Sequence, residues 1–334
     1  MASASVKDVA ALARVSIGTV SNVLNRPEIV APETVERVTL AMQKLSYVRN
    51  EAARQLRVGH SRALGLVTLS GSNPFFTELT TAAEDCAAAA GYSVIAGNSN
   101  ERKDREAGYL NLFEELRVRG VLISPVGNVV PRLRRMRERG IPGVLVDRVS
   151  SDLSFSSVSV DDVAGGELAV THLIESGRSR IAFVGGPTGI RQVSDRLKGA
   201  QQAIAAHPGA GLEVITLDGL SVQEGIRAGT EFVERPRSHR PDAIFAANDL
   251  LAIGLLQAIF MQGHLAIPQE IALVGYDDIL FAGASVVPLT SVRQPSGLIG
   301  ETAVTILLEE AEDADLEPRQ VVYQPELVIR ASSS

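Results

Sequence analysis

The sequence is poor in features that several common classes of protein require. Cys86 is the only cysteine in 334 residues, which excludes an internal disulfide and a four-thiolate metal site. No stretch of about 18 uninterrupted apolar residues occurs, which excludes a membrane-spanning helix. The N-terminal segment lacks the basic region and long apolar run of a secretion signal, so we expect a cytoplasmic protein.

Sequence motifs of common enzymes are absent as well. There is no G-x-G-x-x-G motif after a strand, no P-loop lysine motif and no G-x-S-x-G elbow. The five histidines are scattered without the spacing of metal ligands, and Cys86 lies in an alanine-rich run typical of a small core residue. We therefore expect no enzyme activity, no catalytic residue, no metal and no cofactor.

Composition and charge indicate a globular protein with two unlike parts. Apolar residues make up 45% and charged residues 21% of the chain, and the length suits two to three domains. The formal charge of −7 argues by itself against a nucleic-acid partner. Residues 1–62, however, hold nine basic and five acidic residues, whereas the remainder holds 23 basic and 34 acidic residues. A basic head and an acidic body suggest two modules with different partners.

The first 60 residues have the pattern of short helices. Ser5 and Asp8 resemble a capping box, Ser16 can cap a helix from Ile17 to about Leu24, and Pro32 suits the first turn of a third helix. Two short helices joined by the corner at 13–15 form a helix-turn-helix, whose second helix fits the major groove of DNA. A helical hairpin used only for packing is the alternative.

From Ala63 onward, short strand-like runs alternate with helical stretches. This alternation predicts parallel sheets with helices on both faces, an α/β fold. The series restarts near Arg180, which indicates two similar lobes, and the short final strands suggest that the chain crosses back between them. The predicted strands are Leu64–Leu69, Ser93–Ala96, Gly120–Ser124, Val144–Val146, Ile181–Val184, Glu213–Leu217, Ala243–Ala246, Ile271–Val274, Val321–Tyr323 and Leu327–Ile329.

Three segments of the head resemble a known family. Lys7–Ala10, Val15–Asn25 and Leu45–Asn50 look like the signature of the lactose-repressor/galactose-repressor (LacI/GalR) family of bacterial transcription regulators, and the resemblance covers nearly the whole chain. It implies an all-α helix-turn-helix head and a two-lobed, periplasmic-binding-protein-like body. The implied boundaries are 1–49 for the head, 50–60 for a hinge helix and linker, 61–162 with 292–323 for the N-terminal lobe, and 163–291 with 324–334 for the C-terminal lobe.

The resemblance also implies which residues of the second helix contact DNA. Ile17, Gly18 and Asn22 occupy the family's base-reading positions: asparagine can pair with adenine, and isoleucine offers only apolar contact. Gly18 has no side chain that could contact a base, and its small size would allow the helix to approach the groove closely. Thr19, Ser21 and Asn25 are expected to contact phosphates, which fix the register without reading the sequence, with helix capping as an alternative for Ser21 and Asn25. Ser16 also belongs to the expected DNA-binding set.

Residues 50–57 resemble the family's hinge helix. Such a short helix is marginal in water, so we expect it to order only when two chains meet on DNA. Leu56 would then wedge into a minor-groove base step beside the small Ala53, while Arg54 and Arg57 neutralise phosphates. Leu56 as an ordinary linker residue is the alternative.

In the body, polar side chains gather at predicted strand ends, where ligands bind between α/β lobes. Carboxylates, an arginine and amides suit the vicinal hydroxyls of a sugar, and an aromatic face suits its apolar side. The resemblance assigns the effector pocket to Ser70, Phe75, Asp147, Gln192, Arg196, Asn248, Asp277 and Gln294. Asp249 and Asp278 fit a structural role better.

These features together predict a DNA-binding regulator. We expect a repressor that binds a palindromic operator as a dimer and is released by a small molecule, a sugar or sugar derivative, bound between the lobes. A dimer is expected because the chain ends at Arg330–Ser334 without the leucine-heptad helix of the family's tetramers. Alternatives are a co-repressor-dependent regulator or activator on the same scaffold, a sugar-binding protein without DNA function, and, third, an α/β enzyme.

Overall fold

The computed structural model describes residues 4–47, 61–150, 152–262 and 264–334. The chain divides into two compact units, Met1–Ser61 and Arg62–Ser334, which we call the head and the body. Within the described residues, no helix combines the length and the apolar character that a bilayer span requires.

The head is helical. One buried valine from each of its α-helices, Val9, Val20 and Val38, contributes to a small apolar core. A core of this size buries little surface, so local interactions must supply much of the head's stability. The elements of its described part are α1 (Val6–Ala13), α2 (Ile17–Asn25), the 3₁₀ turn η1 (Pro27–Ile29) and α3 (Pro32–Lys44).

Local hydrogen bonds define the starts of α1 and α2, as the sequence predicts. The Ser5 hydroxyl accepts from the backbone N–H of Asp8, and the Asp8 carboxylate accepts from the Ser5 N–H at 2.8 Å, which completes a capping box. The Ser16 hydroxyl accepts from the Thr19 N–H at 3.0 Å. Arg14, with φ at 53°, takes the left-handed conformation that turns the chain between the two helices.

The third helix begins differently. Pro32 occupies its first turn, where a missing N–H costs nothing. Ala31 precedes it, and this side chain makes no capping hydrogen bond. The start of α3 is therefore the least stabilised of the three helix starts.

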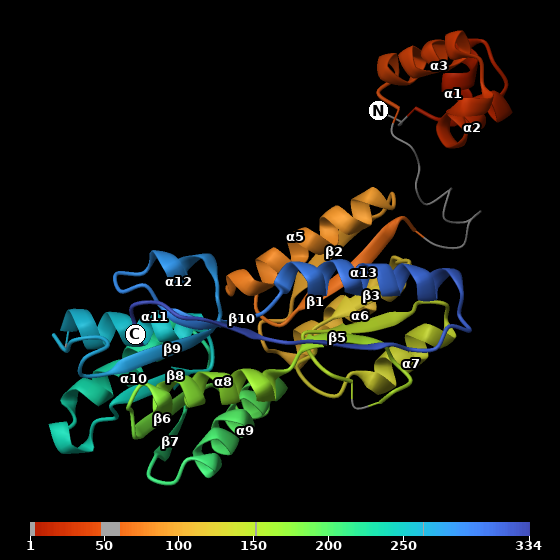
Figure 1. Cartoon of the computed structure of the whole chain (residues 1–334). Coiled ribbons are helices and arrows are strands. Elements are labelled where there is room, and N and C mark those ends of the chain that lie inside the picture. Colours follow the sequence, from red (N-terminus) through yellow and green to blue (C-terminus); the bar gives the residue numbers. More distant parts are fainter. Residues whose placement is uncertain (1–3, 48–60, 151, 263) are drawn as a thin grey trace. The chain divides into compact units, whose positions relative to one another are not determined.

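The body contains two six-stranded sheets (Figure 1). The first has the order β11-β5-β4-β3-β1-β2 and is parallel throughout, and the second has the order β12-β10-β9-β8-β6-β7, with only β12 antiparallel. The predicted α/β class is thus confirmed. The strands are β1 (Ala63–Thr68), β2 (Ser93–Asn98), β3 (Val121–Ile123), β4 (Gly143–Val146), β5 (Ser157–Val160), β6 (Arg180–Gly185), β7 (Gly211–Thr216), β8 (Ala243–Ala246), β9 (Ala272–Asp277), β10 (Thr290–Arg293), β11 (Gln320–Tyr323) and β12 (Glu326–Val328).

Helices cover both faces of the first sheet. Leu66 and Leu122 share a core with α5 and α13, whereas the neighbouring Val67 and Ile123 share a second core with α6 and α7, because successive side chains of a strand point to opposite faces. The helices and turns of the body are α5 (Pro74–Ala89), α6 (Lys103–Glu115), α7 (Val130–Glu138), α8 (Asp162–Glu175), α9 (Arg191–Ala206), α10 (Val222–Glu234), η2 (Arg237–His239), α11 (Asp249–Leu256), the π-helical η3 (Gln257–Gln262), α12 (Leu280–Ala284) and α13 (Ser296–Glu312).

The chain crosses between the two lobes after β5, after β10 and after β11, as the restart of the pattern and the short final strands suggest. One boundary needs correction. β10 pairs with β9 along its full length, from Thr290 to Arg293. Residues 292 and 293, which the resemblance assigned to the N-terminal lobe, therefore lie in the sheet of the C-terminal lobe.

Two long helices, α8 and α13, were not predicted from the sequence. In α8, Gly165 and Gly166 interrupt the apolar pattern, and the reason is close packing against neighbouring elements. A Cβ at Gly166 would lie 2.1 Å from the backbone oxygen of Arg196 in α9, and one at Gly165 would lie 2.2 Å from the hydroxyl of Tyr276. Glycine thus allows α8 to approach the segment that carries Arg196.

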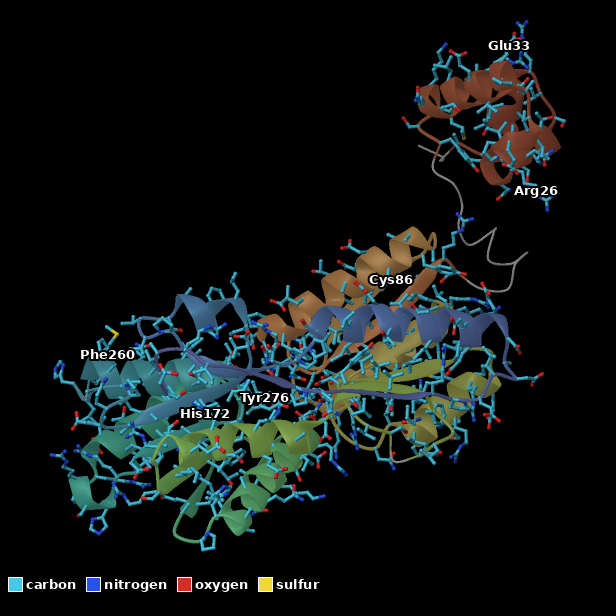
Figure 2. All side chains as sticks on the ribbon, in the orientation of Figure 1. Arg26, Glu33, Cys86, His172, Phe260 and Tyr276 are labelled. Carbon is cyan, nitrogen blue, oxygen red and sulfur yellow. The ribbon has the colours of Figure 1, made fainter. Side chains whose placement is uncertain are left out.

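Cys86 corrects another expectation. It lies on α5 next to α13 and is half-buried, with its Sγ 3.7 Å from the backbone oxygen of Glu301 (Figure 2). It packs at the edge of the core and not within it.

Candidate functional site

The head presents one face of α2 to solvent. Ile17 is 47% exposed, and Gly18 and Asn22 are also exposed, whereas Val20 and Val23 face the core. An exposed helix that follows a short corner has the dimensions to enter the major groove, which is roughly 12 Å wide.

The polar residues of α2 differ in how far they are already engaged. Ser16 caps the helix, and its hydroxyl is 2.9 Å from that of Thr19. The Asn25 amide donates to the backbone oxygen of Ser21 at 2.7 Å. In the described head, the Asn22 side chain makes no hydrogen bond, so its amide is available to pair with a base edge.

Space around Gly18 does not demand glycine. A Cβ at this position would lie 3.5 Å from the Ser16 hydroxyl, an ordinary contact. Glycine at this position is therefore not required by packing within the head.

The predicted hinge residues Ala53, Arg54, Leu56 and Arg57 lie outside the described residues.

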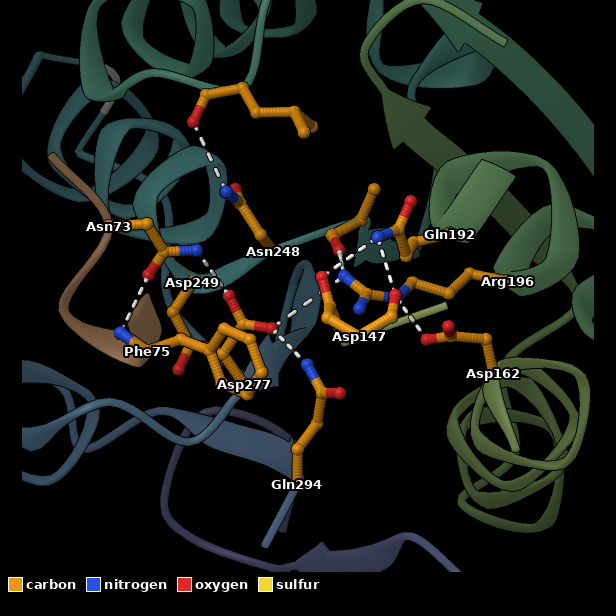
Figure 3. Close-up of polar contacts among 12 residues, drawn as sticks. Asn73, Phe75, Asp147, Asp162, Gln192, Arg196, Asn248, Asp249, Asp277 and Gln294 are labelled. Atoms are coloured by element: carbon orange, nitrogen blue, oxygen red, sulfur yellow. Dashed lines mark hydrogen bonds and ion pairs between the residues drawn. The ribbon is translucent and has the colours of Figure 1, made fainter. Parts of the chain in front are cut away.

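A second candidate site lies in the body, between the carboxyl ends of strands in both lobes (Figure 3). Asp147 directly follows β4, Asp277 ends β9 and Gln294 follows β10, while Gln192 and Arg196 lie on α9. The cavity among these side chains has a volume of about 30 Å³, so the side chains fill most of the space between the lobes. The lining residues are Leu69, Asn73, Phe75, Phe76, Asp147, Ile190, Gln192, Val193, Arg196, Leu220, Asn248, Asp277 and Gln294.

Asp277 is a centre of hydrogen bonding in this pocket. Its carboxylate accepts from the amide of Asn73 at 2.7 Å and from that of Gln294 at 2.7 Å. Asn73 also caps α5 of the first lobe by accepting from the Phe75 N–H. The Asn73–Asp277 hydrogen bond therefore connects the two lobes directly.

A second direct bond between the lobes joins Asp147 and Gln192. The Gln192 amide donates to the Asp147 carboxyl at 2.8 Å and to its backbone oxygen at 2.6 Å. Burial raises the pKa of Asp147 to about 8, with a further contribution from the carboxylate of Asp162. Asp147 also has a φ of 57°, a left-handed conformation that costs free energy for a non-glycine residue.

Arg196 is buried, and two nitrogens of its guanidinium are engaged on its side of the pocket. It donates to the Asp162 carboxylate at 2.7 Å and to the backbone oxygen of Ala247 at 2.7 Å, and it lies 3.6 Å from the Asp277 carboxylate. Its guanidinium stacks on Tyr276, 3.6 Å from the ring centroid. Burial by itself lowers the pKa of Arg196, but the surrounding carboxylates, Asp162 first, raise it above its ordinary value.

Some polar atoms in the pocket lack a partner. Asn248 caps α11 by accepting from the Leu251 N–H, and its amide donates to the Leu220 oxygen at 3.2 Å. In contrast, Oδ1 of Asp147 and Oε1 of Gln294 are buried without a hydrogen-bond partner. A buried polar atom without a partner is costly, so these two atoms point to a bound molecule as their partner.

The structure brings together Phe75, Asp147, Gln192, Arg196, Asn248, Asp277 and Gln294 of the predicted effector residues. Ser70 is not among the lining residues, and its hydroxyl lies 3.0 Å from that of Ser72. The sequence prediction omitted the lining residues Asn73 and Phe76, and Asp162 behind Arg196. Asn73 before a proline is a recognisable helix-cap signal, whereas the role of Asp162 required the packing of α8 on α9.

Two further aspartates serve the fold. Asp249 is fully buried and accepts from the Ile279 N–H and the Ser291 hydroxyl. Asp278 forms ion pairs with Arg293 and Arg330 at 2.8 and 2.6 Å. Both arrangements match the structural role expected for these residues.

Comparison with known proteins identifies relatives of this chain. Residues 5–50 match the family model of bacterial regulatory proteins, lacI family, and residues 170–333 match that of the periplasmic binding protein-like domain. The HTH-type transcriptional repressor PurR of Escherichia coli is 32% identical over 335 residues, which cover 98% of this chain and 96% of PurR.

Solved structures agree in fold over almost the whole length. The lac repressor dimer bound to operator and the anti-inducer ONPF has a TM-score of 0.85 at 26% identity, covering 99% of both chains. The complex of the transcriptional regulator CelR with cellobiose has a TM-score of 0.73 at 28% identity, covering 98% of this chain and 99% of CelR.

Proposed function

The chain belongs to the lacI family of bacterial regulatory proteins and is a DNA-binding transcriptional repressor that responds to a small molecule; we propose that it binds a palindromic operator as a dimer and leaves it when a sugar enters the interlobe pocket. The observation that carries this proposal is the pair of unpartnered buried oxygens of Asp147 and Gln294 in a pocket bridged by both lobes. The named relatives are regulators and not enzymes. Because a repressor acts on the chromosome, we place it in the cytoplasm.

Operator recognition is assigned to α2. Asn22 offers a free amide for an adenine edge, and Ile17 offers an apolar side chain for a thymine methyl group. Ser16, Thr19, Ser21 and Asn25 lie on the same helix and are proposed to position it on phosphates. A two-fold dimer would present two such helices to two half-sites.

Operator binding tests this assignment. Asn22→Ala should remove discrimination at one base pair in each half-site, by about 1–3 kcal/mol for each contact. Arg54→Gln and Arg57→Gln are the matched controls, because loss of a phosphate contact weakens all sequences alike and flattens the salt dependence. If the two kinds of variant changed sequence preference equally, the base-reading role of Asn22 would be wrong.

The effector is proposed to act by replacing the direct bonds between the lobes. The Asn73–Asp277 and Asp147–Gln192 contacts occupy the polar groups that line the pocket, and we propose that an entering sugar displaces them. The lobe arrangement then depends on the ligand, and ligand and operator affinities become coupled reciprocally. The proposed lobe segments are 61–162 with 294–323, and 163–293 with 324–334.

An operator-binding titration with a panel of free sugars tests the direction of this coupling. Weaker operator binding on addition of a sugar supports induction. Stronger binding would identify a co-repressor acting through the same pocket, and unchanged affinity across a broad panel would overturn sugar control. The class of sugar-binding protein without DNA function is not favoured, because it leaves the helix-turn-helix head unexplained.

The body offers a surface for the second copy. Leu280 and Phe281 of α12 are 75% and 55% exposed, and Val286 and Ile329 are exposed beside them. α12 adjoins the segment after β12, since a Cβ at Gly283 would lie 3.8 Å from Arg330. Large exposed apolar side chains in a group are typical of interfaces, and the related lac repressor is a dimer.

Light scattering on purified protein tests this surface. Phe281→Asp should shift the protein toward the monomer. Leu153→Asp is the matched control, since Leu153 is 73% exposed, more than Phe281, but lies in a loop of the other lobe. A Phe281→Asp protein with an unchanged mass would assign the dimer contact elsewhere.

A further inference from the structure

The charges buried around the interlobe pocket are strongly unequal. Asp147, Asp162, Asp249 and Asp277 are all buried, whereas Arg196 is the single cationic side chain among the described residues that line the cavity. Burial raises the pKa of each of the four carboxyl groups. The surroundings of the pocket therefore disfavour the negative charge even of the protein's own carboxyl groups.

That cation is not available to a ligand's negative charge. Asp162 accepts from Nε of Arg196 at 2.7 Å, and the Asp277 carboxylate lies 3.6 Å from Nη1, which also donates to the Ala247 backbone oxygen. The guanidinium face is covered by the ring of Tyr276. Arg196 can still donate a hydrogen bond, but its charge is balanced by carboxylates of the protein itself.

The atoms left for a ligand are oxygens. Oδ1 of Asp147 and Oε1 of Gln294 are buried and unpartnered. Oε1 of an amide can only accept a hydrogen bond, and a ligand that satisfies it must carry an O–H or N–H group. Phe75 and Phe76, whose rings meet edge to face with centroids 5.0 Å apart, supply the apolar wall of the same cavity.

We propose that the effector carries no negative charge and hydrogen-bonds to Asp147 and Gln294 through neutral hydroxyl or N–H groups, so that phosphorylated sugars, sugar acids and nucleotides are rejected. This inference rests on the proposed function, since it specifies the ligand of the same pocket. The physical reason is that a buried anion without a free counter-ion loses its hydration and gains no ion pair in return.

Calorimetric titration of the full chain with matched pairs of compounds tests the inference. Suitable pairs are ribose and ribose 5-phosphate, glucose and glucose 6-phosphate, and adenosine with its 5′-monophosphate. For every pair with a binding member, we expect the neutral compound to bind and the phosphate ester to bind at least about a hundredfold more weakly. The sugar and nucleoside pairs distinguish the two sources of such a neutral ligand.

A variant tests the reason for the discrimination. Asp162 lies behind Arg196 and does not line the cavity. Asp162→Asn keeps a hydrogen-bond acceptor for Arg196 but removes the balancing charge, so the difference between the neutral compound and its phosphate ester should shrink at least about tenfold. The pairs measured with the unmodified protein remain decisive if this variant does not fold.

The outcomes separate the two proposals. A phosphate ester that binds as tightly as its neutral parent, with binding lost in Gln294→Met, would overturn the charge inference and leave the pocket as the effector site. Binding that survives both Gln294→Met and Phe75→Ala, or no binding by any member of the panel, would overturn the proposed function and the inference with it.

Discussion

The head and the body use aspartate in opposite ways. In the head, Asp8 is exposed, and backbone and side-chain hydrogen bonds from Ser5 lower its pKa. In the body, burial raises the pKa of Asp147 to about 8. An exposed carboxylate that caps a helix favours the charged form, whereas a carboxyl group in a closed pocket favours the neutral form. The head is therefore organised by short-range contacts of exposed groups, and the pocket by long-range contacts of buried ones.

Breaking the buried network should have the largest effect. Arg196→Met leaves Asp162 and Asp277 buried without their cation, and we expect it to lower the free energy of unfolding of the body by about 3–5 kcal/mol. Arg191→Met on the same helix is the control: its ion pair with Asp195 is exposed, and its loss should cost at most about 1 kcal/mol. Urea unfolding measures both, and equal losses would show that the Arg196 network does not stabilise the body.

The pH dependence of stability should have opposite signs in the two parts. Between the unfolded pKa and a folded pKa of about 8, Asp147 is protonated in the folded body and ionised in the unfolded chain. Each unit of rising pH in this window therefore costs about 1.4 kcal/mol of stability. Asp147→Asn should remove this contribution between pH 5 and 8, whereas Asp218→Asn, a fully exposed control, should not.

The head, in contrast, should lose stability as the pH falls. Because the pKa of Asp8 is lowered on folding, its stabilising contribution is lost as the pH falls below about 4. Amide hydrogen exchange, which reports on the two parts separately, measures both trends. A head that weakened as the pH rose from 5 to 8 would contradict the comparison.

Helix caps should contribute less free energy than the buried network, and they should stabilise only the head. Ser16→Ala removes the acceptor for the Thr19 N–H and should destabilise α2 by about 1 kcal/mol. Ala31→Ser supplies the missing cap of α3 and should stabilise the head by about 0.5–1 kcal/mol. Hydrogen exchange in α1, α2 and α3 measures both changes, and an equal change in the body would mean that the effect is not local.

Gly18→Ala should change stability only slightly, and it tests whether the stability of α2 and operator affinity change in opposite directions. A Cβ fits at this position, so alanine should stabilise α2 by up to about 1 kcal/mol. If glycine is present for close approach to the groove, the same variant should bind the operator more weakly. Thermal unfolding and operator titration measure the two effects, and unchanged operator affinity would show that Gly18 has no role in DNA binding.

The pattern of successes follows the range of the interactions involved. The caps at Ser5 and Ser16 and the proline at the start of α3 were predictable because each depends on residues within one helical turn. Most strand ends were predictable from β-branched runs, although β5 and β10 were not predicted, and seven of the eight predicted effector residues line the cavity. Ser70 follows β1 but does not line the cavity, because the sequence of a loop does not indicate which of its side chains point into a pocket.

The sequence by itself determined the helix-turn-helix head, the α/β class of the body and its restart as a second lobe, because hydrophobic periodicity and helix caps are local properties. Only the tertiary structure decided that Asn73 meets Asp277, that Asp162 balances Arg196 and that two oxygens of the pocket remain unpartnered. Asn73 and Asp277 are 204 residues apart in the chain. Contacts at such separations arise from the packing of sheets and helices, and the proposed selection of an uncharged effector depends on them.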